Sequence, residues 1–158
     1  MATNPEKYYK SFYDNSPIGF YTTNLENGDF LMANTAAARI LGCKTVEELL
    51  SRKSTDFYSH VARDFLIEQV KEFNKVSDYE VEIKLPTTGD KKWVSISAIR
   101  CAHGECLQGS ITDISSRKDM EKELDMIKQS SMNLLKKIEK QAQDKIKKID
   151  EEALELHG

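Results

Sequence analysis

The chain has 158 residues, of which 39% are hydrophobic and 31% charged, and its formal net charge is −3. This length suits one domain of ordinary size plus an appendage, and the slightly acidic balance argues against nucleic acid or an anionic membrane as a partner. No stretch resembles a signal peptide or a membrane span, and three cysteines without a framework spacing are typical of a reducing compartment. We therefore expect a cytoplasmic protein without direct membrane contact.

The composition changes near Ser116. Residues 1–116 contain every proline, tryptophan, phenylalanine and tyrosine of the chain, whereas 117–158 consists mostly of charged and helix-forming residues. A shift of this kind marks a domain boundary. We expect a globular domain over 1–116 and a separate helical segment over 117–158.

The first elements are short. The segment "KYYKSFYDNS" (7–16) predicts a helix with aromatic side chains along one side. Two strands follow, "GFYTTN" (19–24) and "DFLMAN" (29–34), and Asn27-Gly28 between them indicates a hairpin.

Two short helices come next. The segment "TAAARILG" (35–42) reads as a helix that Gly42 ends at its C′ position. The segment "TVEELL" (45–50) reads as a second helix, which Thr45 and Glu48 begin as a capping box.

A longer amphipathic helix is predicted for "SHVARDFLIEQVKEF" (59–73). Its residues at helical spacing are Val61, Phe65, Leu66, Gln69, Val70 and Phe73. Three alternating runs then predict strands at 79–85, 92–101 and 106–114. Strands followed by small helices and then three more strands favour an α+β fold, with a five-stranded antiparallel sheet and helices on one face.

The C-terminal segment has no helix breaker from Arg117 to about Leu156. Apolar residues follow a three-four spacing, interrupted by Ser131, at Met120, Leu124, Ile127, Leu134 and Ile138. The stripe resumes one residue out of phase at Ala142, Ile146, Ile149, Ala153 and Leu156. This pattern favours a long helix that forms a parallel two-stranded coiled coil, and therefore a homodimer, over a helix folded back on its own domain.

Several segments, taken in order, resemble a bacterial PAS (sensory box) domain. The resemblance covers about residues 8–118 and begins with the strand-turn-strand that ends in Asn34. It continues through "AAARILG", "TVEELL" and "GDKKW" and closes with "GSITDISSRK" (109–118). It implies a sensory or signal-relay role, and an effector beyond residue 158 such as a histidine kinase or a diguanylate cyclase.

The resemblance also implies that the last strand joins an output helix directly. A joint without a glycine-rich loop would transmit a displacement of the sheet. The expected coupling residues are Trp93, Asp113, Ser115 and Arg117. We further expect Asp113 to pair with a basic residue near Trp93, such as Lys92, and Ser116 with Asp119 to cap the helix start.

No catalytic constellation is present in the sequence, so we do not expect an enzyme. The segment "CAHGEC" (101–106) brings three soft ligands into one turn, but zinc requires four. A cross-strand disulfide there is geometrically conceivable but disfavoured in a reducing cytosol. Ordinary hairpin residues are the preferred interpretation, over metal binding or redox sensing.

Cofactor-binding branches of the family fit less well. The segment "SRKSTDFYSH" (51–60) lacks the cysteine of flavin-binding light sensors, and His60 stands too early on the long helix for a haem ligand. An apolar ligand pocket between that helix and the sheet remains, and the parity of the fourth strand follows the family. The expected lining is Tyr21, Ile40, Phe65, Gln69, Val94 and Ile96. A filled core is equally compatible, and the alternative function is then a ligand-free dimerisation or docking module.

Overall fold

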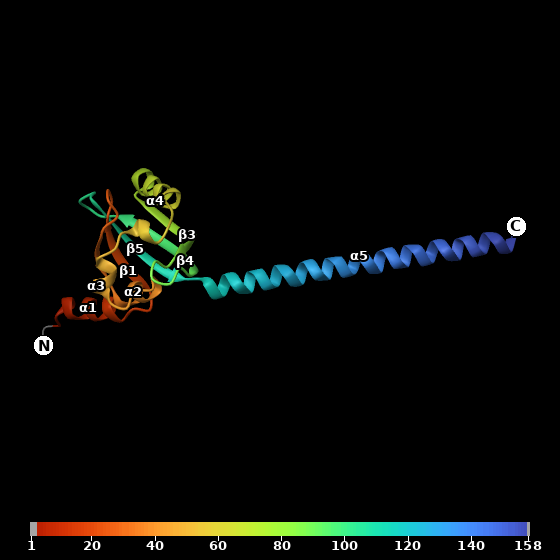
Figure 1. The fold of residues 1–158 in the computed structure, drawn as a ribbon, viewed down its shortest axis with the longest axis horizontal. Helices are drawn as coiled ribbons and strands as arrows, with labels where there is room; N and C mark the ends of the chain where they lie inside the picture. The colour runs from red at the N-terminus through yellow and green to blue at the C-terminus, as the bar shows by residue number, and fades with distance from the viewer. Residues whose placement is uncertain (1–2, 158) are drawn as a thin grey trace. The chain divides into compact units, whose positions relative to one another are not determined.

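The computed structural model describes residues 3–157. The sheet of five strands has the order β2-β1-β5-β4-β3, and every neighbouring pair is antiparallel (Figure 1). The elements in chain order are α1 (Pro5–Asn15), β1 (Gly19–Asn24), β2 (Phe30–Ala33), α2 (Thr35–Ile40), α3 (Val46–Leu50), the 3-10 helix η1 (Ser54–Asp56), α4 (His60–Phe73), β3 (Lys75–Lys84), β4 (Lys91–Arg100), β5 (Cys106–Asp113) and α5 (Ser115–His157).

The chain divides into two compact units, Met1–Ser116 and Arg117–Gly158. In the first unit, alternate side chains of the strands are buried, and helices α2, α3 and α4 pack against the sheet. Val94, Ile96 and Ala98 of β4 lie in this core. The predicted α+β fold with a five-stranded antiparallel sheet is confirmed, because period-two burial requires one covered face.

Helix α2 is fixed at both ends by local sequence. At its start, the side chain of Asn34 accepts a hydrogen bond from the N–H of Ala37 at 2.9 Å. At its end, Gly42 has φ +73°, its N–H donates to Arg39, and the next N–H, of Cys43, donates to Ala38. This is a Schellman motif, and it places Gly42 at C′ as the sequence predicts.

The cap of α3 differs from the predicted capping box. Thr45 does accept a hydrogen bond from the N–H of Glu48, at 3.1 Å. The Glu48 carboxylate, however, accepts from the N–H of Lys44 at 2.7 Å and not from Thr45. The reciprocal bond therefore reaches one residue further back than a capping box requires.

The buried stripe of α4 differs from the predicted one. Val61 is 79% exposed and Phe73 is 56% exposed, so neither belongs to the core. The buried residues are Ala62, Leu66 and Val70. They follow a four-residue spacing, so the buried stripe of the helix is narrow. The six residues named from the sequence would form a wider buried stripe.

Strand β3 begins four residues earlier than predicted, at Lys75 and not at Tyr79. Asn74 takes a left-handed conformation (φ 60°) that ends α4 and leads directly into the strand. A register shift between Val76 and Tyr79, with Asp78 at φ 50°, marks a bulge. The bulge hid the start of the strand, because the extra residues break the alternating pattern.

The second unit consists of α5, a helix of 43 residues whose first two residues, Ser115 and Ser116, belong to the first unit. None of its described residues is buried within the single chain. The predicted seam residues, from Met120 to Ile138, are all exposed. The long helix is confirmed, and its pairing as a coiled coil stays a prediction. Among the described residues, no helix is both long and apolar enough to cross a membrane.

Candidate functional site

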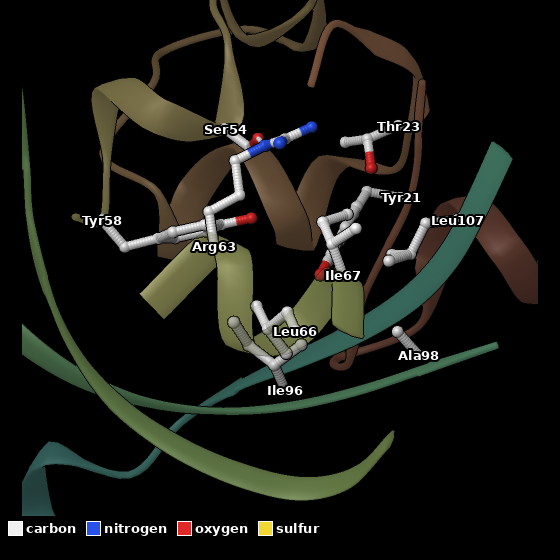
Figure 2. A pocket seen from close by; sticks show the side chains of 10 residues that line it. All are labelled: Tyr21, Thr23, Ser54, Tyr58, Arg63, Leu66, Ile67, Ile96, Ala98 and Leu107. Atoms are coloured by element: carbon white, nitrogen blue, oxygen red, sulfur yellow. Dashed lines mark hydrogen bonds between the residues drawn. The ribbon is translucent and has the colours of Figure 1, made fainter. Parts of the chain in front are cut away.

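A small enclosed cavity lies between α4 and the sheet (Figure 2). Its volume is about 10 Å³, which is enough for about one water molecule. The lining residues are Tyr21, Thr23, Ser54, Tyr58, Arg63, Leu66, Ile67, Ile96, Ala98 and Leu107.

The structure brings together only part of the predicted pocket. Tyr21 and Ile96 line the cavity. Ile40 and Val94 are buried in the same core but do not line the cavity.

The two remaining predicted residues lie elsewhere. Phe65 and Gln69 border an open groove between α4 and β3, where the Phe65 ring packs on Tyr79 with centroids 4.9 Å apart. Phe65 is therefore 41% exposed, and Leu66, one residue further on, takes the inward position. The predicted lining by Phe65 and Gln69 is wrong, because the helix is rotated by about one residue from the predicted orientation.

One end of the cavity is polar, and Arg63 dominates it. Its Nη2 donates hydrogen bonds to the carbonyls of Leu25 (3.1 Å) and Glu26 (3.3 Å), and its Nε donates to the Ser54 hydroxyl (3.4 Å). Gly28, at φ +77°, passes so close that a Cβ there would lie 2.5 Å from the Ser54 Oγ. Arg63 thus holds the turn after β1 through hydrogen bonds to its backbone. The sequence did not predict this contact.

The two tyrosines of the cavity are neutral. Burial raises the pKa of Tyr21 well above its ordinary value, and the neighbouring Tyr58 adds to this. Burial also raises the pKa of Tyr58, although a hydrogen bond to Ser54 and the charge of Arg63 oppose the rise. The site therefore offers hydroxyl donors and acceptors beside one fixed positive charge.

Tyr21 depends on a glycine of the neighbouring strand. Tyr21 and Gly109 face each other across β1 and β5. A Cβ at Gly109 would lie 2.5 Å from the Tyr21 Cζ and 2.6 Å from its hydroxyl oxygen. The aromatic ring occupies the space that a side chain at Gly109 would need.

The junction of β5 and α5 contains most of the predicted coupling residues. The N–H of Ile114 donates to the carbonyl of Trp93 at 2.9 Å, and the N–H of Trp93 donates to the hydroxyl of Ser115 at 3.1 Å. The Lys92 ammonium lies 3.4 Å from Asp113 and donates to the carbonyl of Ile40 at 2.9 Å. These bonds tie the start of α5 to β4 and, through Lys92, to the end of α2.

Asp113, and not the predicted Ser116, caps the start of α5. Its carboxylate accepts a hydrogen bond from the N–H of Ser115 at 2.9 Å. Burial opposes its ionisation, but the hydrogen bonds from Ser115 and the charge of Lys92 outweigh this and lower the pKa of Asp113 below its ordinary value. Arg117 pairs with Glu121, one turn further along α5, at 2.7 Å.

The hairpin between β4 and β5 corrects another prediction. Cys101 and Cys106 form a disulfide, although the sequence favoured unbonded hairpin residues. The two positions close the hairpin, with Cα atoms 5.3 Å apart, within the range that a disulfide requires. Cys43 is free and buried, and burial raises the pKa of its thiol.

A second apolar surface lies where α1 meets the outer face of the sheet. It is an open groove of about 790 Å³, and Tyr9, Phe12, Phe20, Met32 and Ile99 supply much of its lining. Tyr13 stacks on Phe20, with centroids 6.0 Å apart. The aromatic side of α1 was predicted, but not that it would border this groove.

His60 is the histidine that stands nearest to the position of a haem ligand on α4 in the sequence. His60 is the first residue of α4 and is exposed. Within residues 3–157, no group of three or more histidine, cysteine, aspartate or glutamate side chains is placed to hold a metal ion. The expectation that haem and flavin are disfavoured rests on the sequence and stays a prediction.

The PAS fold family matches residues 7–114, which is more than half of the chain. The protein belongs to the PAS family, as the sequence resemblance predicted. No curated protein matches the chain.

Several solved structures share the fold. A domain of a sensory box sensor histidine kinase/response regulator from Geobacter sulfurreducens is 18% identical, with a TM-score of 0.58 over 69% of this chain and 94% of that one. A PAS domain from Colwellia psychrerythraea is 14% identical, with a TM-score of 0.61 over 72% and 99%. The PAS domain of nitrogen regulation protein NR(II) from Vibrio parahaemolyticus is 13% identical, with a TM-score of 0.55 over 72% and 100%.

Proposed function

We propose that the protein is a sensory or signal-relay module, in which a change in the PAS domain moves α5, and α5 pairs in parallel with a second copy to control an effector. The observation that carries the proposal is the junction of β5 and α5. Only Ile114 separates the last strand from the helix, and that residue is itself hydrogen-bonded to Trp93. A displacement of the sheet has no flexible loop to absorb it.

The proposed dimer rests on the exposed stripe of α5. Leu124 is 51% exposed and Ile127 is 63% exposed in the single chain. An apolar stripe of this kind, flanked by charged residues, is stabilised when a second helix covers it. The one-residue phase change between Ile138 and Ile146 would locally unwind the pair without ending it.

The effector belongs to the same proposal. One of the solved structures with this fold is a domain of a sensory box sensor histidine kinase/response regulator. By association with such proteins, we propose a histidine kinase or a diguanylate cyclase as the downstream effector of a cytoplasmic, non-catalytic module that does not bind nucleic acid.

The experiment that tests the coil compares two substitutions on the full chain. Leu124→Lys places a charge on the predicted seam, and Met126→Lys places the same charge two residues away, off the seam. Met126 is 59% exposed, close to Leu124, so the pair is matched. Sedimentation equilibrium should give a dimer for the wild type and Met126→Lys. The dimer dissociation constant should be at least about tenfold higher for Leu124→Lys. A monomeric wild type, or equal effects of both substitutions, would contradict the proposal.

The small cavity favours a second candidate function. A volume of about 10 Å³ holds no organic ligand without rearrangement of the core. A ligand-free dimerisation or docking module would have such a core. Native mass spectrometry of the purified chain separates the two: bound small-molecule mass supports a ligand sensor, and a dimer without added mass supports partner-driven relay or docking.

A further inference from the structure

The disulfide of the β4–β5 hairpin lies in a loop at the protein surface. Cys101 and Cys106 are both half-buried, and the residues between them, from Ala102 to Glu105, lie mostly on the surface. The guanidinium of Arg100 donates to the carbonyl of Gly104 at 3.1 Å, so a positive charge lies at this loop. A nearby positive charge favours the thiolate form of a cysteine, which is the reactive form in thiol–disulfide exchange.

The third cysteine provides an internal contrast. Cys43 is 7% exposed, and burial raises the pKa of its thiol. A buried thiol with a raised pKa is a poor nucleophile. The three cysteines therefore differ in their surroundings: Cys43 is buried and free, and Cys101 and Cys106 form a half-buried disulfide.

The hairpin is connected to the polar end of the cavity. The N–H of Leu25 donates to the carbonyl of Glu105, inside the disulfide loop, at 2.9 Å. The carbonyl of the same Leu25 accepts the hydrogen bond from Arg63 at 3.1 Å. A single residue, Leu25, thus joins the disulfide loop to Arg63.

We propose that Cys101 and Cys106 form a thiol–disulfide switch that exchanges with a low-molecular-weight thiol and controls how firmly the turn at residues 24–28 is held. In reduction, a thiolate of the solute attacks one sulfur, the Cys101–Cys106 bond breaks, and a mixed disulfide forms. The cysteine that was not attacked leaves as a thiolate in this step. A second solute thiolate then attacks the solute sulfur of the mixed disulfide and releases the cysteine that was attacked first. Two solute thiols are oxidised to their disulfide, and the protein gains two thiols.

The switch acts through chain constraint. The disulfide closes a loop of six residues, 101–106, and holds the Glu105 carbonyl where Leu25 needs it. Opening the loop gives those residues conformational freedom and weakens that acceptor. Arg63 then loses a fixed partner at the polar end of the cavity. This inference does not depend on the coiled coil.

The test uses the full chain in buffers with stepped ratios of reduced to oxidised glutathione. Free thiols are trapped with iodoacetamide and counted by intact mass. We expect Cys101 and Cys106 to change together from disulfide to free thiols along the series, and to return when the ratio is reversed. Cys43→Ser should leave that transition unchanged. Amide hydrogen exchange at Leu25 should be at least about tenfold faster in the reduced form.

The double variant Cys101→Ser/Cys106→Ser is the matched reference. Its Leu25 amide should exchange at the faster rate in every buffer. The proposal is overturned if the pair stays in one redox state across the whole series. It is equally overturned if the pair switches while exchange at Leu25 stays the same.

Discussion

The N–H of Trp93 donates a hydrogen bond to the hydroxyl of Ser115, and the carbonyl of the same Trp93 accepts one from Ile114. Strand pairing between β4 and β5 ends at Val94 and Asp113, so these two bonds continue the pairing beyond the sheet. Ser115, the first residue of α5, is therefore hydrogen-bonded to β4 at the position where the next pair of strand residues would be.

Replacing this hydroxyl should weaken the joint. Ser115→Ala leaves the Trp93 N–H without its acceptor, and we expect a loss of about 1 kcal/mol in the free energy of unfolding. Ser116→Ala is the control, because Ser116 is the next residue along α5 and is exposed. Urea titration of both variants measures the difference. Equal stability of the two would show that the bond to Trp93 contributes nothing.

Asp113 should make stability depend on pH. Its pKa is lower in the folded chain than in the unfolded one, near 4, so its contribution is present above that value and is lost as the pH falls through the folded-state pKa. The stability advantage of the wild type over Asp113→Asn should therefore shrink below about pH 4. Urea titrations across the acidic range measure it, with Asp125→Asn on the exposed surface of α5 as control. An advantage that stays constant down to the lowest pH would contradict the assignment.

Asn34 should be among the most sensitive positions of the domain. Its side chain is 1% exposed and makes four hydrogen bonds: its oxygen accepts from Phe20 and Ala37, and its nitrogen donates to the carbonyls of Tyr13 and Ile18.

Asn34→Ala leaves several buried backbone groups without partners, and we expect a loss of about 2–4 kcal/mol in the free energy of unfolding. Asn15→Ala is the matched control. The Asn15 side chain donates hydrogen bonds to Ser11, one turn back in α1, at the exposed surface. The loss for Asn15→Ala should therefore stay below about 1 kcal/mol. Thermal unfolding by calorimetry would decide, and a small effect of Asn34→Ala would mean that water replaces these bonds.

Gly109→Ala should destabilise the domain by about 1–3 kcal/mol, because its methyl group would overlap the ring of Tyr21. A smaller residue at position 21 removes the clash, so Gly109→Ala should cost less in a Tyr21→Leu background. A double-mutant cycle by urea titration measures this coupling. Additive effects of the two substitutions would rule out the steric explanation.

The sequence predicted those elements whose pattern is local. The strand over 19–24 matches β1 residue for residue, and Gly42 ends α2 as expected, because alternation and a left-handed glycine are properties of a few neighbouring residues. The face of α4 was predicted wrongly. Phe65 is more apolar than Ala62, yet Ala62 is buried, since the distance between helix and sheet decides which side chain fits.

The sequence also did not predict the contacts between distant segments, because these depend on how the elements pack in three dimensions. The hub at Asn34 joins residues 13 to 37, and Arg63 reaches back to Leu25. Neither partner can be read from spacing along the chain. The pairing of Lys92 with Asp113 was foreseen only through the family resemblance, and the disulfide was undervalued because the expected compartment argued against it.

The chain contains a single tryptophan, Trp93, and it stands half-buried at the joint between β4 and α5. Indole emission responds to the polarity around the ring, so the intrinsic fluorescence of the unmodified protein reports on one place only. Any input that loosens or shifts the start of α5 changes the colour or intensity of that emission without a label. The emission of Trp93 can therefore be used to follow the joint between the sheet and α5, through which the proposed signal relay would act.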